Sequence, residues 1–218
     1  MLRGRKAVRI GFLLAIILFV AGCAGQGFQP QQVTLAPRLL SVAVRIGGGA
    51  KVYITVADER GTNSYFLGYK ADTHTFGRAE ITTSDDIRII YQKALSEGLA
   101  NLGFNVVNGP DPAVPNLEVS LRRFLYMGFG PNFYVVQIRY VTAAATVRVR
   151  RRQTEAGGGQ LVSVVREKSY EVYHYDNSRS VPNPGQVEER INAALSELMT
   201  KLLVDVELLT FLRATGPG

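Results

Sequence analysis

The sequence predicts an α+β domain: an antiparallel or mixed β-sheet with two amphipathic helices packed on one face. Two segments, 84–103 and 183–202, repeat apolar residues at helical spacing. Several other segments are rich in β-branched and aromatic residues and alternate in polarity, as half-buried strands do. From residue 117 onward the strand patterns follow one another around a glycine-rich turn, which predicts an antiparallel meander.

The first strand pattern covers Lys51–Ala57, after an apolar stretch at Leu39–Ile46 and three consecutive glycines. β-Branched and aromatic residues occupy both faces of the 51–57 pattern, and a polar turn ends it. The polar loop that follows contains Gly68 and is expected to hold one further short strand, at 79–82.

Ser84 is predicted to cap the first helix, with Asp85 and Asp86 in the first turn, where the positive end of the helix dipole favours acidic side chains. Gly103 is expected to end this helix. Its apolar stripe consists of Ile87, Tyr91, Ala94, Leu95, Leu99 and Leu102.

The region between the two helices is predicted to supply the rest of the sheet. Strand patterns cover 104–107, 117–122, 133–152 and 161–175, and a hairpin is expected at Gly157–Gly159. Residues 108–115 are rich in Gly, Pro, Asn and Asp and predict a loop.

The last helix is predicted to begin at Asn183, which can cap it while Gln186 reaches back and Pro184 supplies the φ angle of the first turn. Its apolar stripe consists of Val187, Ile191, Ala194, Leu195, Leu198 and Leu202. Glu188, Glu189 and Glu197 are expected on its solvated side. A short apolar segment at 206–212 is expected to close the core.

The N-terminus has the pattern of a bacterial lipoprotein signal. Four basic residues precede an eleven-residue apolar run, Ile10–Val20, which is too short to span a bilayer. Ala21 and Gly22 follow and lead to Cys23, the only cysteine of the chain. The pattern predicts cleavage between Gly22 and Cys23 and lipid attachment at Cys23. The alternatives are an ordinary signal peptide followed by a chance cysteine, or an uncleaved anchor.

The predicted organisation is a signal peptide at 1–22, a flexible tether at 23–36, one domain at 37–213 and a disordered tail at 214–218. The signal carries four of the 25 basic residues and none of the 18 acidic ones. Without it the net charge falls from +7 to +3, which weakens any argument for nucleic-acid binding. Ala24, rather than aspartate, after the cysteine favours the periplasmic face of the outer membrane.

Several segments, in order, resemble the YajG family of bacterial outer-membrane lipoproteins. They are the strand and turn at Val52–Arg60, a downstream Gly68, the helix end and strand at Leu99–Val107, and the C-terminal stretch Leu195–Leu212. The resemblance runs from about residue 46 to residue 212. It implies a lipoprotein of the Gram-negative outer membrane and no defined biochemical role. The glycine hairpin at 157–159 and the run Arg150–Arg152 look particular to this chain.

Sequence motifs for catalysis or cofactor binding are not found. His74 and His174 have no metal-ligand spacing with each other or with a third residue, and the chain has no G-x-S-x-G, H-E-x-x-H or P-loop motif. We therefore expect no cofactor, no metal and no enzymatic activity. A hydrolase would need a cleft that gathers Asp58 and one of the histidines with a nucleophile.

Three groups of residues are candidates for a partner surface. Asp58 and Arg60, two residues apart at a strand end, could bind a partner, or Asp58 could cap the loop and pair with Arg60. Arg148 and the run containing Arg150 and Arg152, followed by Arg166 and Lys168, could form a positive patch, or they could keep an exposed hairpin soluble.

The third candidate is Phe129, within the aromatic and glycine-rich stretch 124–134. This stretch could form an adhesive surface. Alternatively its aromatics belong to two neighbouring strands and pack into the core, leaving only Phe129 at the tip.

The sequence favours a lipid-anchored, non-enzymatic periplasmic domain that binds another component of the cell envelope by surface contacts, with an envelope protein as one possible partner. The alternative is a module that binds a lipid, a glycan or a peptidoglycan fragment. The periplasmic compartment argues against a nucleic-acid partner.

Overall fold

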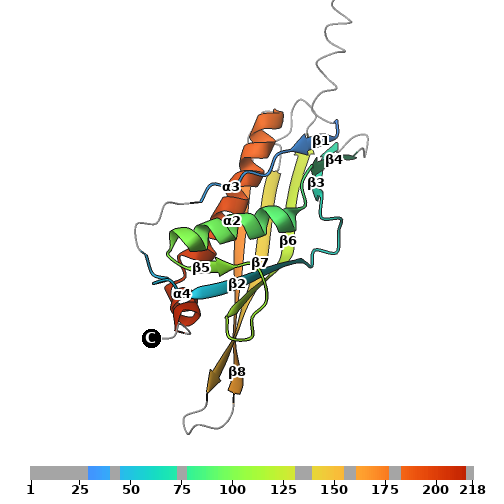
Figure 1. Cartoon of the computed structure of the whole chain (residues 1–218). Coiled ribbons are helices and arrows are strands. Elements are labelled where there is room, and N and C mark those ends of the chain that lie inside the picture. Colours follow the sequence, from blue (N-terminus) through green and yellow to red (C-terminus); the bar gives the residue numbers. More distant parts are fainter. Residues whose placement is uncertain are drawn as a thin grey trace, which may run out of the picture.

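A computed structural model describes residues 29–39, 45–72, 78–130, 139–154, 161–176 and 183–214. In these residues one eight-stranded mixed sheet is combined with three helices, so the predicted α+β class is confirmed (Figure 1). The strands are β1 Gln31–Val33, β2 Lys51–Asp58, β3 Phe66–Asp72, β4 Arg78–Thr83, β5 Asn105–Val107, β6 Asn116–Gly130, β7 Arg139–Thr154 and β8 Leu161–Asp176. The helices are α2 Ile87–Asn101, α3 Pro184–Leu203 and α4 Val206–Arg213. None of the described helices is long and apolar enough to cross a membrane.

Strand β6 is the centre of the sheet. One of its edges pairs in parallel with β2 along its first half and with β3 along its second half. The other edge pairs antiparallel with β7, which pairs antiparallel with β8, so the predicted meander is confirmed for these strands. Strand β5 lies beside β2, while β4 and then β1 lie beside β3.

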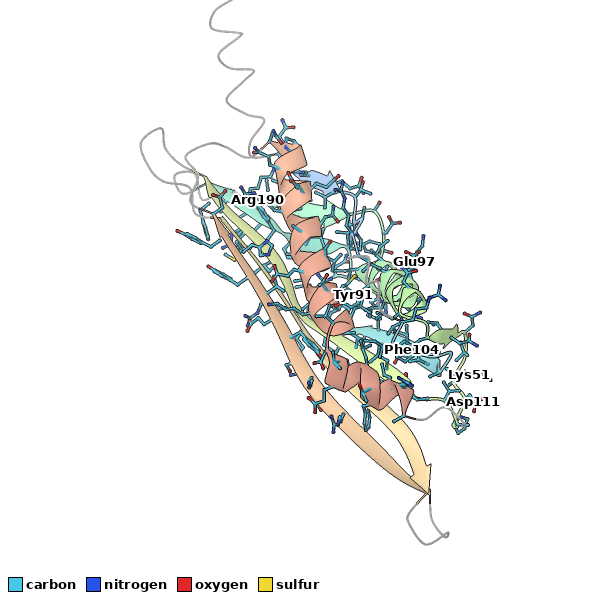
Figure 2. The ribbon with its side chains drawn as sticks, turned by 90° about the vertical axis from the view of Figure 1, so that its left-hand side faces the viewer. Lys51, Tyr91, Glu97, Phe104, Asp111 and Arg190 are labelled. Atoms are coloured by element: carbon cyan, nitrogen blue, oxygen red, sulfur yellow. The ribbon has the colours of Figure 1, made fainter. Side chains whose placement is uncertain are left out.

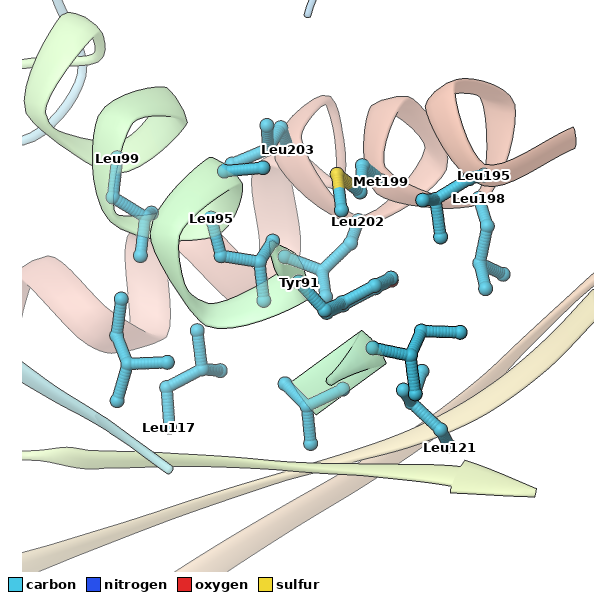
Figure 3. Close-up of a cluster of buried hydrophobic side chains, with 14 of the residues drawn as sticks. Tyr91, Leu95, Leu99, Leu117, Leu121, Leu195, Leu198, Met199, Leu202 and Leu203 are labelled. Carbon is cyan, nitrogen blue, oxygen red and sulfur yellow. The ribbon is translucent and has the colours of Figure 1, made fainter. Parts of the chain in front are cut away.

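The helices cover one face of this sheet and form the core with it. Figure 3 shows Tyr91, Leu95 and Leu99 of α2 beside the leucines of α3, above Leu117 and Leu121 of β6. All of these side chains are essentially inaccessible to solvent. Both predicted apolar stripes therefore face the sheet, and α4, formed by the segment predicted to close the core, buries Leu208, Leu209, Phe211 and Leu212.

The opposite face of the sheet is not covered by any described helix (Figure 2). Strand β8 separates the two faces clearly. Its even-numbered residues from 166 to 176 include those that bond to α3 and α4. Its odd-numbered residues from 165 to 175 are exposed. We call the face that carries these odd-numbered residues the open face.

The helix ends follow the sequence signals closely. Asn183 and Gln186 form the predicted capping box, with the Gln186 amide donating to the Asn183 side chain at 2.8 Å. Gly103, with φ of +87°, ends the α2 region as predicted. The N-cap of α2 is Asp86 rather than Ser84, because the Asp86 carboxylate accepts a hydrogen bond from the Arg88 amide at 2.9 Å.

Two strand predictions differ from the structure. Strand β3 lies in the segment expected to be a polar loop. Gly68 is predicted to be a loop residue, but it lies at a β-bulge inside the strand, with φ of +146°. Strand β6 continues to Gly130, well beyond the strand predicted at 117–122, and therefore includes Phe124 and Phe129. The apolar stretch at 39–46 falls mainly on residues 40–44, outside the described residues, and Leu39 and Ile46 are not in a strand.

Part of the segment predicted to be a flexible tether, 23–36, belongs to the fold. Gln31–Val33 pair with β4, and Val33 and Leu35 are buried in the core. The backbone that follows runs along α3 and binds side chains spaced one helical turn apart. The amides of Thr34, Ala36 and Arg38 donate to the side chains of Glu188, Asn192 and Ser196 at 2.9, 2.7 and 2.9 Å. We call this set of bonds the polar ladder. Glu188, expected to be solvated, is therefore a bonding residue.

Asn192 makes two hydrogen bonds to this backbone. It accepts the Ala36 amide of the polar ladder, and its side-chain NH₂ donates to the Thr34 carbonyl at 2.9 Å. Replacing Asn192 with alanine is expected to cost about 1 kcal/mol of unfolding free energy. Hydrogen exchange at the Ala36 amide should accelerate more than exchange in β6. The matched control is Glu189→Ala on the exposed side of the same helix, and equal acceleration in both variants would argue against the ladder.

The hydroxyl of Tyr91 is buried in the core and has no hydrogen-bond partner among the described residues. Burial also raises the pKa of this phenol well above its usual value. Because a buried hydroxyl without a partner is costly, Tyr91→Phe should raise the unfolding free energy by about 1 kcal/mol. Urea unfolding measures this change. A loss of stability would indicate that the hydroxyl is bonded in solution.

Candidate functional site

Two of the predicted site residues, Gly22 and Cys23, lie outside the described residues. Cleavage and lipid attachment there stay predictions from the sequence. The other candidates, Asp58, Arg60, Phe129, Arg150 and Arg152, fall on described backbone, in or beside β2, β6 and β7.

Asp58 and Arg60 form a closed ion pair where β2 ends. The Arg60 guanidinium donates Nε–H to one carboxylate oxygen of Asp58 and Nη2–H to the other, each at 2.7 Å. Its Nη1–H reaches the Phe66 carbonyl at 2.7 Å, at the start of β3. The Arg60 and Asp58 side chains are only 3% and 7% exposed. The pair therefore joins β2 to β3 across the intervening loop.

This geometry favours the interpretation in which Asp58 caps the loop and pairs with Arg60, over the one in which the two residues bind a partner. Side chains that are this inaccessible, with their donors already bonded, leave a partner little to contact. Burial acts to raise the pKa of Asp58, but the hydrogen bonds and positive charge of Arg60 outweigh it and hold that pKa below its usual value.

The lowered pKa of Asp58 makes stability depend on pH. The unfolded chain, with its ordinary carboxyl pKa of about 4, binds the proton more readily than the folded one. The contribution of Asp58 is therefore complete above that value and is lost as pH falls through the lower folded pKa. The difference in unfolding free energy between the native chain and Asp58→Asn should shrink below about pH 4. Urea unfolding at a series of pH values measures it, and a constant difference down to pH 2.5 would contradict the argument.

Arg166 and Lys168 do not belong to a free positive patch. Lys168 binds Asp205 at 2.9 Å and Glu207 at 2.6 Å, and Arg166 pairs with Glu207 and lies over the Phe211 ring. Their charges are thus compensated by acids about 40 residues away in the sequence. Sequence spacing could not reveal this, because β8 and the start of α4 meet only in the folded chain.

Asp205 is the centre of this network. It accepts bonds from the Lys168 ammonium, the Tyr170 hydroxyl at 2.8 Å and the Leu208 amide at 2.9 Å, the last of which caps α4. Burial would raise the pKa of Asp205, but these donors lower it overall. The network fixes α4 to β8.

Arg150 and Arg152 lie in β7, where Arg150 pairs with Asn116 on one side and Val165 on the other, and Arg152 pairs with Ser163. The basic run therefore lies in a strand, as predicted, on the long arm that β7 and β8 form. Their role in binding stays a prediction.

The aromatic stretch divides between the two faces of β6. Phe124 and Tyr126 are buried toward the helices, as the core interpretation requires. Met127 and Phe129 are half-buried on the open face, so neither a fully exposed patch nor a fully buried one is found. Phe129 is not at a tip, since it pairs with Ala71 inside the sheet.

The histidines do not gather with Asp58. His174 shares a hydrogen bond of 2.7 Å with Glu197, which also binds Lys201 at 3.3 Å, so Glu197 is not simply solvated. The bond from His174 is the largest of the effects that lower the pKa of Glu197. His74 lies outside the described residues. Among the described residues no cluster of His, Cys, Asp and Glu could hold a metal ion.

Lys70 is a candidate binding residue that no sequence pattern indicates. It is only 5% exposed, and its neighbours across the sheet are the small residues Ala79 and Gly128. No ion-pair partner is found for it among the described residues, and burial lowers the pKa of its ammonium group. A buried cation of this kind can bind an anionic group.

Solved structures show which fold this is. Protein XCC0632 of Xanthomonas campestris is similar over 84% of this chain and 98% of its own, with a TM-score of 0.58 and 12% identity. A neuraminyllactose-binding hemagglutinin homolog of Helicobacter pylori covers 84% of this chain and 97% of its own, with a TM-score of 0.43 and 8% identity. A protein of Caulobacter crescentus CB15 described as a lipoprotein covers 70% and 94%, at a TM-score of 0.31 and 11% identity.

At these identities only the first similarity bears on the argument, and it concerns the fold alone. A search of curated proteins gives no match. The model of a family described as uncharacterized lipoprotein matches residues 37–213, which is most of the chain and includes strands β2 to β8 and all three described helices. The chain therefore belongs to this family of uncharacterized lipoproteins, the YajG family.

Proposed function

We propose that the chain is anchored through a lipid on Cys23 in the periplasmic leaflet of a Gram-negative outer membrane. The domain then acts as a non-enzymatic accessory that binds another protein of the envelope. The family of lipoproteins and the signal ending in the only cysteine support the anchor. Ala24 supports the outer membrane over the inner one.

The observation that carries the binding role is the β7–β8 arm around Arg150. Val165 of β8 is 48% exposed and pairs with Arg150 of β7. Protein interfaces are enriched in arginine and bury apolar side chains. By contrast, the buried Asp58–Arg60 pair and the His174–Glu197 pair are occupied in holding loops and helices in place.

The anchor is tested by mass spectrometry of the protein extracted from membranes. We expect the N-terminal peptide to begin at Cys23 and to carry acyl chains, and the Cys23→Ser variant to lose both the added mass and its sedimentation with membranes. A native chain that keeps residues 1–22, or carries no lipid, would contradict the anchor.

The binding role is tested by photocrosslinking in intact cells. A photoreactive residue at Val165 or Arg150, on the β7–β8 arm, should capture one defined envelope protein. The control position is Lys93, on the exposed side of α2. Capture of lipid and abundant porins only, or the same products from Lys93, would argue against a specific partner.

Lys70 favours the alternative, a module that binds an anionic lipid, glycan or peptidoglycan fragment. If that alternative holds, native mass spectrometry of protein purified from membranes should find a bound anionic molecule that Lys70→Met loses. If the purified protein carries no bound anionic molecule, the result favours the accessory role over the ligand-binding role.

A further inference from the structure

Tyr69, Met127 and Tyr175 lie in one row across one end of the sheet. Tyr69 of β3 pairs with Met127 of β6, and both Met127 and Tyr175 of β8 pair with the backbone of residue 140 in β7. Residues directly opposite each other on paired strands share a face. The row therefore lies on the open face, where Tyr175 is exposed.

The surface around this row is apolar with polar tips. Tyr173 precedes Tyr175 on the same face and is 60% exposed, and Phe129 follows Met127. The Tyr69 hydroxyl donates to the Met127 sulfur at 3.6 Å, and the Arg78 guanidinium lies 4.9 Å from the centre of the Tyr69 ring. We call Tyr69, Met127, Phe129, Tyr173 and Tyr175 the aromatic face.

The chain enters the fold beside this surface. Gln31, the first residue of β1, pairs with Ile81 of β4, and the adjacent Glu80 pairs with Tyr69. Gln31 is thus two strands from Tyr69, about 10 Å at the usual strand spacing. Figure 1 shows β1, β3 and β4 together at this end of the sheet.

Chain length limits how far this end can be from a lipid on Cys23. Gln31 is eight positions after Cys23, and even a fully extended chain covers only about 27 Å over that length. The other end of β8 lies much farther from the point where the chain enters the fold than Tyr175 does. Val165 is ten residues before Tyr175, about 33 Å along the strand.

We propose that the aromatic face lies against the head-group region of the bilayer in which Cys23 is anchored. This inference rests on the lipid anchor proposed above. Tyrosine suits the boundary between lipid and water, because its ring is apolar and its hydroxyl can stay hydrated. Arg78 is placed to meet phosphate groups. The domain is then held at two points, and the β7–β8 arm with Arg150 and Val165 extends into the periplasm.

The absence of tryptophan from the chain provides the test. Tyr175→Trp puts a single fluorescent reporter into the aromatic face. Val165→Trp is a matched control on the same strand and the same face, with similar exposure. Each lipidated variant is reconstituted into phosphatidylethanolamine–phosphatidylglycerol vesicles, with or without phospholipid brominated near the head group.

We expect the emission of the Tyr175→Trp variant to shift to the blue and to be quenched by the brominated lipid, and that of Val165→Trp to do neither. Equal quenching at both positions, or at neither, overturns the proposal. If the reporter at position 175 is exposed in vesicles but shielded in native envelopes, a protein covers the aromatic face instead.

Mass spectrometry of the same samples separates this inference from the anchor on which it rests. A chain without acyl groups would refute the anchor itself. A lipidated, vesicle-bound chain with an unquenched reporter at position 175 would refute only the contact of the aromatic face with the bilayer.

Discussion

Replacing Arg60 with methionine is expected to lower the unfolding free energy by about 3–5 kcal/mol, the usual cost of removing one partner from a buried ion pair. The Asp58 carboxylate would stay behind with 7% exposure and no counter-ion. The Phe66 carbonyl would also lose its donor at 2.7 Å. Urea unfolding at pH 7 measures the change.

The matched control is Arg122→Met. Arg122 also contacts an acid, Glu59, but at 3.7 Å and with both side chains about half exposed. Exposed pairs of this kind contribute about 0–1 kcal/mol. Similar losses in the two variants would show that burial of the Asp58–Arg60 pair is unimportant. If Arg60→Met fails to fold, the unfolding free energy of Asp58→Asn measures the contribution of the pair instead. This substitution removes the charge of Asp58 and retains a similar shape.

Replacing Gly68 with alanine is expected to cost about 3 kcal/mol or more, from backbone strain and steric overlap together. Gly68 has φ of +146°, which side chains rarely allow, and an added Cβ would lie 2.0 Å from the Tyr126 carbonyl oxygen. That oxygen belongs to the strand paired with β3, so β3 would have to move away from β6. Thermal and urea unfolding measure the loss.

Gly61→Ala is the matched control for Gly68→Ala. Gly61 also has a positive φ, of +72°, but its Cβ would meet nothing within 4 Å. The control should therefore lose only the strain of the left-handed backbone, about 1–2 kcal/mol. Because Gly68 precedes Tyr69, its substitution should also disturb the aromatic face, while the control should not. Equal losses would mean that the close approach of β3 and β6 is relaxed in solution.

The sequence predicted the elements whose signals are local. The capping residues at Asn183 and Gln186 and the apolar stripes of both helices are periodic features of short segments, and all are found as expected. Strand β3 was missed because a glycine in a polar segment usually indicates a loop. Gly68 is needed in the strand because the Tyr126 backbone lies too close for any side chain. Strand β1 was missed because Gln31 and its glutamine and proline neighbours outweighed the alternation of Val33 and Leu35.

The candidate site depended on contacts that no spacing reveals. The Asp58–Arg60 pair could be predicted because its members are two positions apart, although its burial could not. The compensation of Lys168 by Asp205, the isolation of Lys70 and the row from Tyr69 to Tyr175 all join residues distant in the sequence. They follow from strand register and from the packing of α4 on β8, and sequence patterns determine neither.

The polar ladder has a mechanical consequence if Cys23 is tied to a membrane. A pull on the lipid would reach the fold at the N-terminal end of β1, which pairs in parallel with β4. The force would then pass to the backbone bound by Glu188, Asn192 and Ser196 of α3. The load would act along these segments and across their hydrogen bonds, so the bonds would resist in shear and share the force. A peeling geometry would break them one at a time. The first element after the tether is therefore arranged to transmit tension into α3 without unravelling the sheet.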